Sequence, residues 1–120
     1  MRYLCLVYFE PPTLAALTPA EDAELTRNSL DYDDDLRTGG HFVHADALQP
    51  VTAATTVRVR NGKLSTTDGP FAETKEVLGG FILIEARDLN EAIRLAGGIP
   101  LARLGSIEVR PVLKLVREPQ

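Results

Sequence analysis

The sequence predicts an α+β fold in which a ferredoxin-like split βαβ pattern forms an antiparallel sheet and carries an inserted β-hairpin. Three observations lead to this prediction. Residues 2–9 and 80–86 are apolar at both alternating positions, as buried strands are. Helix-start patterns occur at Thr18 and Asp88, each ahead of a stripe of apolar residues. Between them, an Asn-Gly pair separates two alternating runs, which is typical of a hairpin.

Length and charge narrow the class of protein. The chain has 120 residues, 44% of them apolar and 25% charged, which predicts one globular domain over residues 1–120. Its formal charge of −4 argues against a nucleic-acid or membrane-surface partner. A single cysteine, Cys5, excludes an internal disulfide. We expect a cytoplasmic protein, because Glu10-Pro11-Pro12 follows the apolar start where small residues would mark a signal cleavage site.

The first strand and the first helix follow from local patterns. Residues 2–9 read as a strand covered on both faces, and residues 10–17 as a loop. Thr18 is the expected N-cap of a helix over residues 19–37, because Glu21 stands at the position that reaches back in a capping box. Its apolar stripe comprises Leu25, Tyr32 and Leu36.

The middle of the chain predicts a strand and a hairpin. Residues 41–48 alternate as a second strand and end before a proline. Residues 55–60 and 63–67 form the arms of the hairpin around Asn61-Gly62, because both residues of such a turn need positive φ.

The end of the chain repeats the strand–helix–strand order. Residues 80–86 form a strand, Asp88 and Glu91 a second capping box, and residues 106–116 a last strand. The apolar stripe of the second helix is expected at Leu89, Ala92, Ile93 and Ala96.

The predicted helices can cover only one of the two faces of the predicted sheet. Two helices cover one face of a four-stranded sheet, yet residues 2–9 and 80–86 carry large apolar side chains on the other face as well. For a small acidic chain, the simplest cover is the same sheet of a second copy related by a two-fold axis. The sequence therefore predicts a homodimer with two sheets packed face to face.

Residues 67–76 carry the motif TDGPFAETKE, followed by LGGF at 78–81 and IEVRPV at 107–112. With ALQP at 47–50 and TVRV at 56–59, these segments resemble the DGPF-domain branch of the YCII-related family over essentially the whole chain. The resemblance implies a dimeric α+β barrel built from ferredoxin-like halves. It also implies a possible association with extracytoplasmic-function sigma factors, because many members are encoded near or fused to them.

The wider family includes a dehydrochlorinase whose proposed chemistry uses a His-Asp pair. The family histidine lies in the helix after the first strand. Here the helix over residues 19–37 contains no histidine, so that pair is not carried over.

His44 and Asp46 are candidate catalytic residues. On a strand they share a face with Phe42. His44 and Asp46 are then about 6.5–7 Å apart, which is too far for a direct hydrogen bond but close enough for both to reach one substrate. Histidine near a carboxylate is a reasonable general base, and Phe42 is a candidate ligand-binding wall. In the alternative interpretation, this is an edge strand whose polar residues meet water.

Asp68, Phe71 and Arg110 complete the candidate site. In one interpretation Asp68 organises a turn and Phe71 plugs the core; in the other, Asp68 is a catalytic carboxylate at a cleft and Phe71 its apolar wall. Arg110 either pairs with Glu108 or holds an anionic group of a ligand. We expect no metal site and no cofactor.

Two hypotheses for function remain open. The first is a small-molecule-binding homodimer with a pocket between sheet and hairpin. In its catalytic form it is a cofactor-independent lyase or isomerase, in which His44 is the base and Asp46 or Asp68 orients it. The second is a non-catalytic regulatory or accessory protein linked to a sigma factor.

Overall fold

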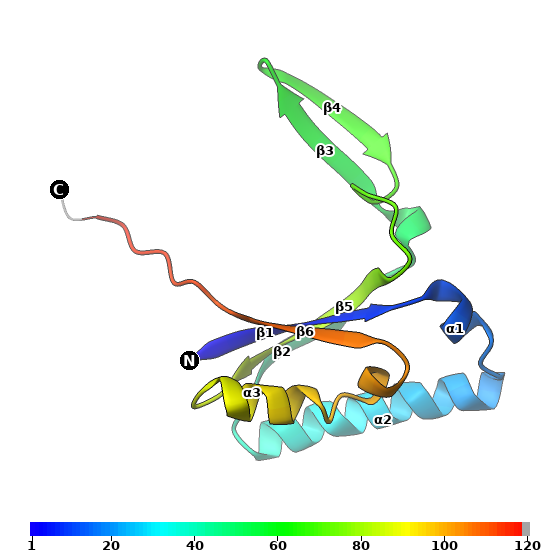
Figure 1. The fold of residues 1–120 in the computed structure, drawn as a ribbon, viewed down its shortest axis with the longest axis vertical. Helices are drawn as coiled ribbons and strands as arrows, with labels where there is room; N and C mark the ends of the chain where they lie inside the picture. The colour runs from blue at the N-terminus through cyan, green and yellow to red at the C-terminus, as the bar shows by residue number, and fades with distance from the viewer. Residues whose placement is uncertain (119–120) are drawn as a thin grey trace.

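A four-stranded antiparallel sheet forms the body of the protein (Figure 1). The structure is a computed structural model that describes residues 1–118. The strands lie in the order β2-β5-β1-β6, and every neighbouring pair is antiparallel. This α+β architecture is consistent with the ferredoxin-like prediction. The elements are β1 (Arg2–Phe9), α1 (Pro11–Ala15), α2 (Pro19–Thr38), β2 (Phe42–Ala47), η1 (Val51–Ala53), β3 (Thr55–Arg60), β4 (Lys63–Asp68), β5 (Val77–Glu85), α3 (Leu89–Ala96), η2 (Pro100–Arg103) and β6 (Ser106–Pro111).

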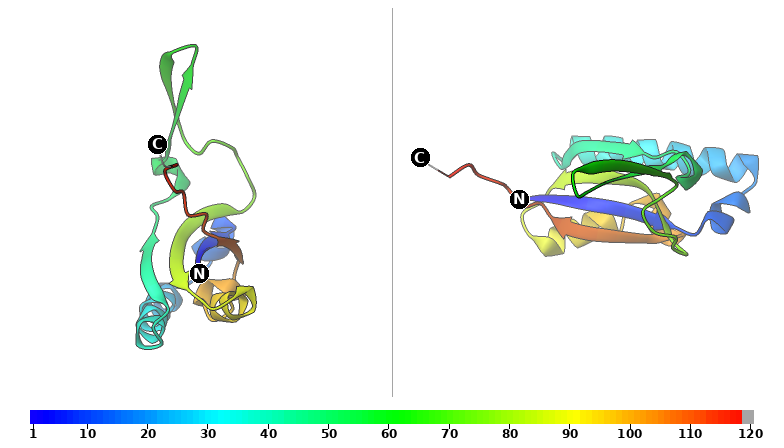
Figure 2. Two further views of the ribbon diagram at one scale, coloured as in Figure 1. Left: turned by 90° about the vertical axis from the view of Figure 1, so that its left-hand side faces the viewer. Right: turned by 90° about the horizontal axis from the view of Figure 1, so that it is seen from above.

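Helices α2 and α3 lie on one face of the sheet and leave the other face without a helix (Figure 2). The core lies between these helices and the sheet, where Tyr3, Cys5 and Val7 of β1 lie beside Ile82 and Ile84 of β5. Cys5 is fully buried, and burial raises the pKa of its thiol to about 11. This cysteine is therefore a small apolar core residue.

Helix α2 begins with the capping box that its sequence predicts. Thr18 Oγ1 accepts from the Glu21 backbone N–H at 3.1 Å, and the Glu21 carboxylate accepts from the Thr18 N–H at 2.9 Å. These bonds lower the pKa of the Glu21 carboxyl. Tyr32 donates to the carbonyl of Leu95 at 2.5 Å and so ties α2 to α3. Within residues 1–118, no helix combines the length and the apolar character that crossing a membrane requires.

Helix α3 differs from its prediction in two respects. Asp88 caps the Glu91 N–H at 2.9 Å, but Glu91 reaches back to the Arg87 N–H instead of closing the capping box. Leu89 and Ile93 are about half exposed, so their assignment to the buried stripe was wrong. The side of the helix that packs on the sheet is made of Ala92, Leu95 and Ala96.

Three predicted segments differ from the structure by several residues, the first of them being β5, which begins at Val77 rather than at residue 80. Residues 10–17 contain the short helix α1, which the two prolines permit because they occupy its first turn. The last strand ends at Pro111 rather than at residue 116. Val112 N–H donates to the carbonyl of Arg2, the first residue of β1, and the pairing ends there; residues 112–118 extend away from the body (Figure 1).

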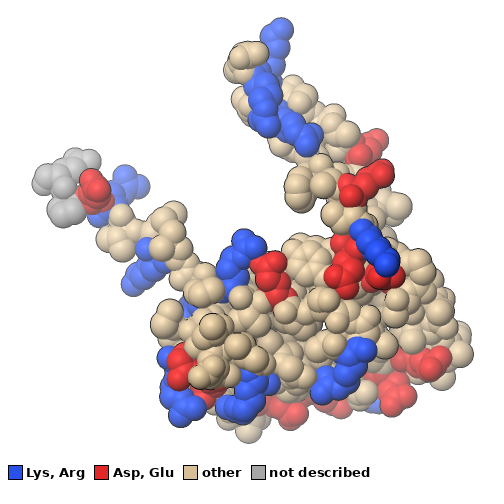
Figure 3. Space-filling view, viewed as in Figure 1, with Lys and Arg blue, Asp and Glu red and all other residues tan. Residues whose placement is uncertain are grey.

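The predicted hairpin, β3–β4, is confirmed, and it forms a two-stranded sheet of its own. Asn61 and Gly62 have φ of 53° and 74°, as the tight turn requires. The hairpin projects from the body on the side of the sheet that the helices leave open (Figures 1 and 2). Lys and Arg side chains gather on it (Figure 3), contributed by Arg58, Arg60 and Lys63.

Candidate functional site

The sheet face turned away from the helices is apolar along its two central strands. In β1 and β5, Leu4 lies opposite Leu83, and Leu6 lies opposite Phe81. All four side chains are only partly buried, because no helix packs on them. We call this surface the open face; its floor is hydrophobic, as binding surfaces for ligands or other proteins often are.

Polar side chains line both edges of the open face. On strand β2, His44 is the register partner of Leu83 and Asp46 that of Phe81. On strand β6, Arg110 is the register partner of Leu4 and Glu108 that of Leu6. Arg110 and Glu108 form an ion pair along their strand. The open face therefore has an apolar floor between a histidine–aspartate edge and an arginine–glutamate edge.

His44 and Asp46 are joined directly by a hydrogen bond. The distance between His44 Nε2 and Asp46 Oδ2 is 2.6 Å, so the expectation that these residues are too far apart to bond was wrong. The expectation counted the spacing of the backbone, whereas side chains lean along a strand and shorten the gap. The imidazole lies beside the Phe81 ring, with 5.9 Å between centroids. About 60% of each side chain is exposed in the single chain.

Phe42 does not belong to this surface, contrary to its assignment beside His44. Phe42 pairs with Ile84, and His44 pairs with the neighbouring Leu83. Two steps along β2 therefore correspond to one step along β5, which leaves Val43 as an extra residue. This β-bulge at Val43 turns Phe42 toward the helices. There it packs against the core, and the Arg37 guanidinium lies 4.1 Å from its ring centroid.

The remaining candidates lie apart from the His44–Asp46 pair within one chain. Asp68 ends β4, on the projecting hairpin. Phe71 follows it and is 80% exposed, so the interpretation of Phe71 as a core plug was wrong. Arg110 stands three strands away from His44, a separation of about 14 Å at the usual strand spacing.

The end of the TDGPFAETKE motif lies against the body and forms a hollow that the sequence did not predict. The Lys75 ammonium lies 3.5 Å from the Glu10 carboxylate, and Ser106 donates to the Glu76 carboxylate at 3.1 Å. Together with Tyr8 and Glu108 they line an open hollow of about 640 Å³ at one end of β1 and β6. No pattern in the sequence links these distant segments.

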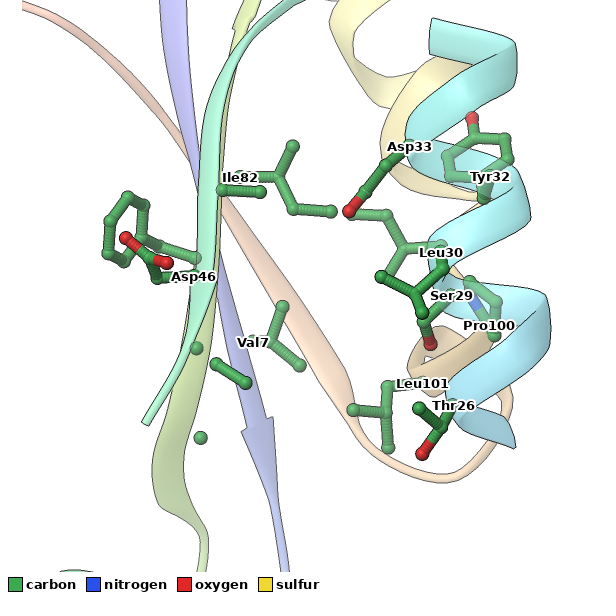
Figure 4. A pocket seen from close by; sticks show the side chains of 16 residues that line it. Val7, Thr26, Ser29, Leu30, Tyr32, Asp33, Asp46, Ile82, Pro100 and Leu101 are labelled. Atoms are coloured by element: carbon green, nitrogen blue, oxygen red, sulfur yellow. The ribbon is translucent and has the colours of Figure 1, made fainter. Parts of the chain in front are cut away.

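A second cavity lies on the helix side of the sheet and was also missed. It measures about 380 Å³ and is lined by α2, the sheet and η2 (Figure 4). The signal in the sequence was the spacing of Ser29 and Asp33, which interrupt the apolar stripe of α2 with polar groups.

Within residues 1–118, no three side chains of His, Cys, Asp or Glu gather in a group that could hold a metal ion.

We expect the two histidines to adopt opposite neutral tautomers. His41 Nδ1 lies 2.9 Å from the carbonyl oxygen of Glu85, which only accepts, so Nδ1 carries the proton. His44 Nε2 faces the Asp46 carboxylate, which when ionised also only accepts, so Nε2 carries the proton. Long-range ¹H–¹⁵N NMR spectra of the neutral imidazoles distinguish the two forms. Identical tautomers in both residues would contradict the geometry, and Asp46→Asn should weaken the preference at His44 alone.

Comparisons with known proteins agree on one family. The model of the YCII-related domain matches residues 1–116. An uncharacterised protein of Rhizobium meliloti (strain 1021) is 37% identical over an alignment of 114 residues, and the alignment covers 93% of this chain and 92% of that protein. Both findings address the wider family, so the DGPF-domain branch stays a prediction.

Proposed function

Since the chain belongs to the YCII-related family, we propose that it is a small-molecule-binding homodimer in which His44, held by Asp46, acts as a general base. The second copy covers the open face and turns the apolar floor into a closed cleft. The observation that carries the proposal is the direct His44–Asp46 hydrogen bond at the border of an apolar surface.

The distribution of apolar residues supports the second copy. Leu4, Leu6 and Leu83 form a continuous apolar strip that one chain leaves partly in water. Contiguous surfaces of this kind usually mark an interface. The hairpin, which projects on the same side of the sheet, adds the exposed apolar residues Val57, Val59 and Leu64, which a second copy would meet. A two-fold interface uses the same surface on both copies, so one strip suffices for both.

The tautomer of His44 supports its role as the base. With Nε2 donating to Asp46, the lone pair of Nδ1 is the free site of the imidazole. Nδ1 takes a proton from the ligand, and the Asp46 carboxylate stabilises the imidazolium that forms. Once the cleft is closed, exclusion of water strengthens this interaction.

The other candidate residues suggest the class of ligand. Arg110 presents a planar fork that suits a carboxylate, and it reaches a ligand near His44 only if it comes from the second copy. Asp68, at the end of the projecting hairpin, and Phe71, three residues later, likewise approach the cleft from the second copy. We propose a small carbonyl acid with an acidic C–H as the ligand, which the protein isomerises or from which it eliminates a leaving group.

Deuterium exchange tests the proposal without knowledge of the net reaction. Small carbonyl acids that raise the melting temperature of the protein are incubated with it in D₂O, and exchange of their C–H is followed by NMR. We expect His44→Gln to slow the exchange by about a hundredfold or more, the usual contribution of a general base. Asp46→Asn is expected to slow it less, because it leaves the base in place.

His41→Gln is the matched control, because it removes the other histidine from a position away from the open face. Its exchange rate should equal that of the wild type. If His44→Gln exchanges as fast as the wild type, the assignment of the base is wrong. Ligands that bind at the open face without exchange would favour the non-catalytic hypothesis instead.

A further inference from the structure

The cavity between α2 and the sheet lies on the side opposite to the proposed cleft (Figure 4). Val7 and Ile82 reach into it from the sheet, and Leu30 and Leu101 line its partly open helix side. Its volume of about 380 Å³ falls within the range of small-molecule sites. Asp46 borders the cavity through its backbone, but its side chain points away through the other face of the sheet (Figure 4).

One carboxylate, Asp33, points from α2 into this apolar space (Figure 4). Within residues 1–118, its half-buried carboxylate takes part in no hydrogen bond or ion pair with another group, and its oxygens are not fully shielded from solvent. Arg37, one turn further along α2, is engaged elsewhere: its guanidinium bonds Asp34 at 2.7 Å and lies over the Phe42 ring. Burial raises the pKa of the Asp33 carboxyl, with Arg37 opposing and Asp34 reinforcing the shift. Asp33 therefore lacks a partner that donates to it.

The nearest polar neighbour on the same helix, Ser29, also accepts rather than donates, whereas the Thr26 hydroxyl lines the cavity nearer the start of α2 (Figure 4). Ser29, one turn before Asp33, donates its hydroxyl proton to the carbonyl of Leu25 at 2.8 Å. Its oxygen lone pairs remain available toward the cavity that Ser29 lines. A ligand that brings a donor to Asp33 therefore gains a hydrogen bond, and one that brings positive charge gains most.

We propose that this cavity binds a small primary amine: a compact apolar body placed against Val7 and Ile82, with a protonated amino group on the Asp33 carboxylate. An anionic ligand of the same shape would meet the charge of Asp33 in apolar surroundings and is disfavoured. The site is independent of the proposed catalytic cleft, because the sheet separates the two.

The test compares three probes that share a 2-phenylethyl body and differ in the polar group: 2-phenylethylamine, 2-phenylethanol and 3-phenylpropanoate. Each is titrated into the full chain while the methyl resonances of Ile82 and Ala45, which line the cavity, are followed by NMR. We expect the amine to shift these resonances and to bind about tenfold or more tightly than the alcohol, because a charged donor makes the stronger hydrogen bond. The carboxylate should not bind.

Asp33→Asn is the critical variant, and Asp34→Asn is its matched control, with the same change of charge on an exposed neighbour. Asp33→Asn should reduce amine affinity to that of the alcohol, and Asp34→Asn should leave the preference intact. Ala45→Leu, which fills the cavity, should weaken both probes. The proposal is overturned if the amine shifts no cavity resonance, if it shifts only Leu6 and Leu83 on the open face, or if both Asp→Asn variants behave alike.

Discussion

Replacing both Leu6 and Leu83 by lysine is expected to convert the proposed homodimer into a folded monomer, raising its dissociation constant roughly a thousandfold or more. Both residues lie at the centre of the open face, on adjacent strands. A two-fold interface would contain each change twice, and each lysine would be desolvated without a partner. Sedimentation velocity over a range of concentrations measures the dissociation constant.

The control for this pair is Leu89→Lys with Ile93→Lys, which adds the same charge to the exposed side of α3. It should leave the dimer intact, and far-UV circular dichroism should show both double variants folded. A wild-type protein that sediments as a monomer at micromolar concentration would remove the basis for a closed cleft. So would a Leu6/Leu83 variant that remains a dimer.

Gly105→Ala is expected to destabilise the protein by about 3 kcal/mol or more, because strands β1 and β6 leave no room for a side chain there. A Cβ atom at Gly105 would overlap the backbone carbonyl oxygen of Tyr8 and lie 3.2 Å from the Cα of Phe9. Backbone atoms of a paired strand cannot move aside without breaking the pairing. Urea denaturation followed by circular dichroism measures the loss in the free energy of unfolding.

Gly97→Ala is the matched comparison for this substitution. Gly97 has helical φ and ψ of −64° and −18°, and a Cβ atom there would lie 3.5 Å from its nearest neighbours, an ordinary contact. We expect its stability to stay within about 0.5 kcal/mol of the wild type. Equal stability of the two alanine variants would show that the close approach at Gly105 does not exist in solution.

Local sequence patterns predicted most elements of the fold. The double apolar alternation of residues 2–9 and 80–86 predicted the two central strands, and the structure confirms both. The capping box at Thr18 and the Asn61-Gly62 turn are also confirmed. Each of these signals depends on residues a few positions apart, so it survives in any tertiary context.

The candidate site was predicted less completely. His44 and Asp46 were placed on one face, as found, but Phe42 was placed beside them, because strict alternation leaves out the β-bulge. Whether a strand bulges depends on how it pairs with a strand nearly 40 residues away in the chain, and no local pattern reports that. The cavity around Asp33 was missed because its walls come from α2, the sheet and η2; the polar Ser29 and Asp33 in the stripe of α2 were its one local signal.

The sequence by itself determined the order of the sheet strands and of the two long helices, which strands are apolar on both faces, and that two helices leave one face of the sheet without cover. These properties follow from side-chain periodicity and from backbone groups that must be satisfied within a turn or two. Only the tertiary structure decided that His44 bonds Asp46, that Phe42 turns to the core, that the hairpin projects from the body, and that Asp33 points into a cavity. Each of these depends on the register and packing of segments distant in the chain, whose contacts form only when the whole domain is folded.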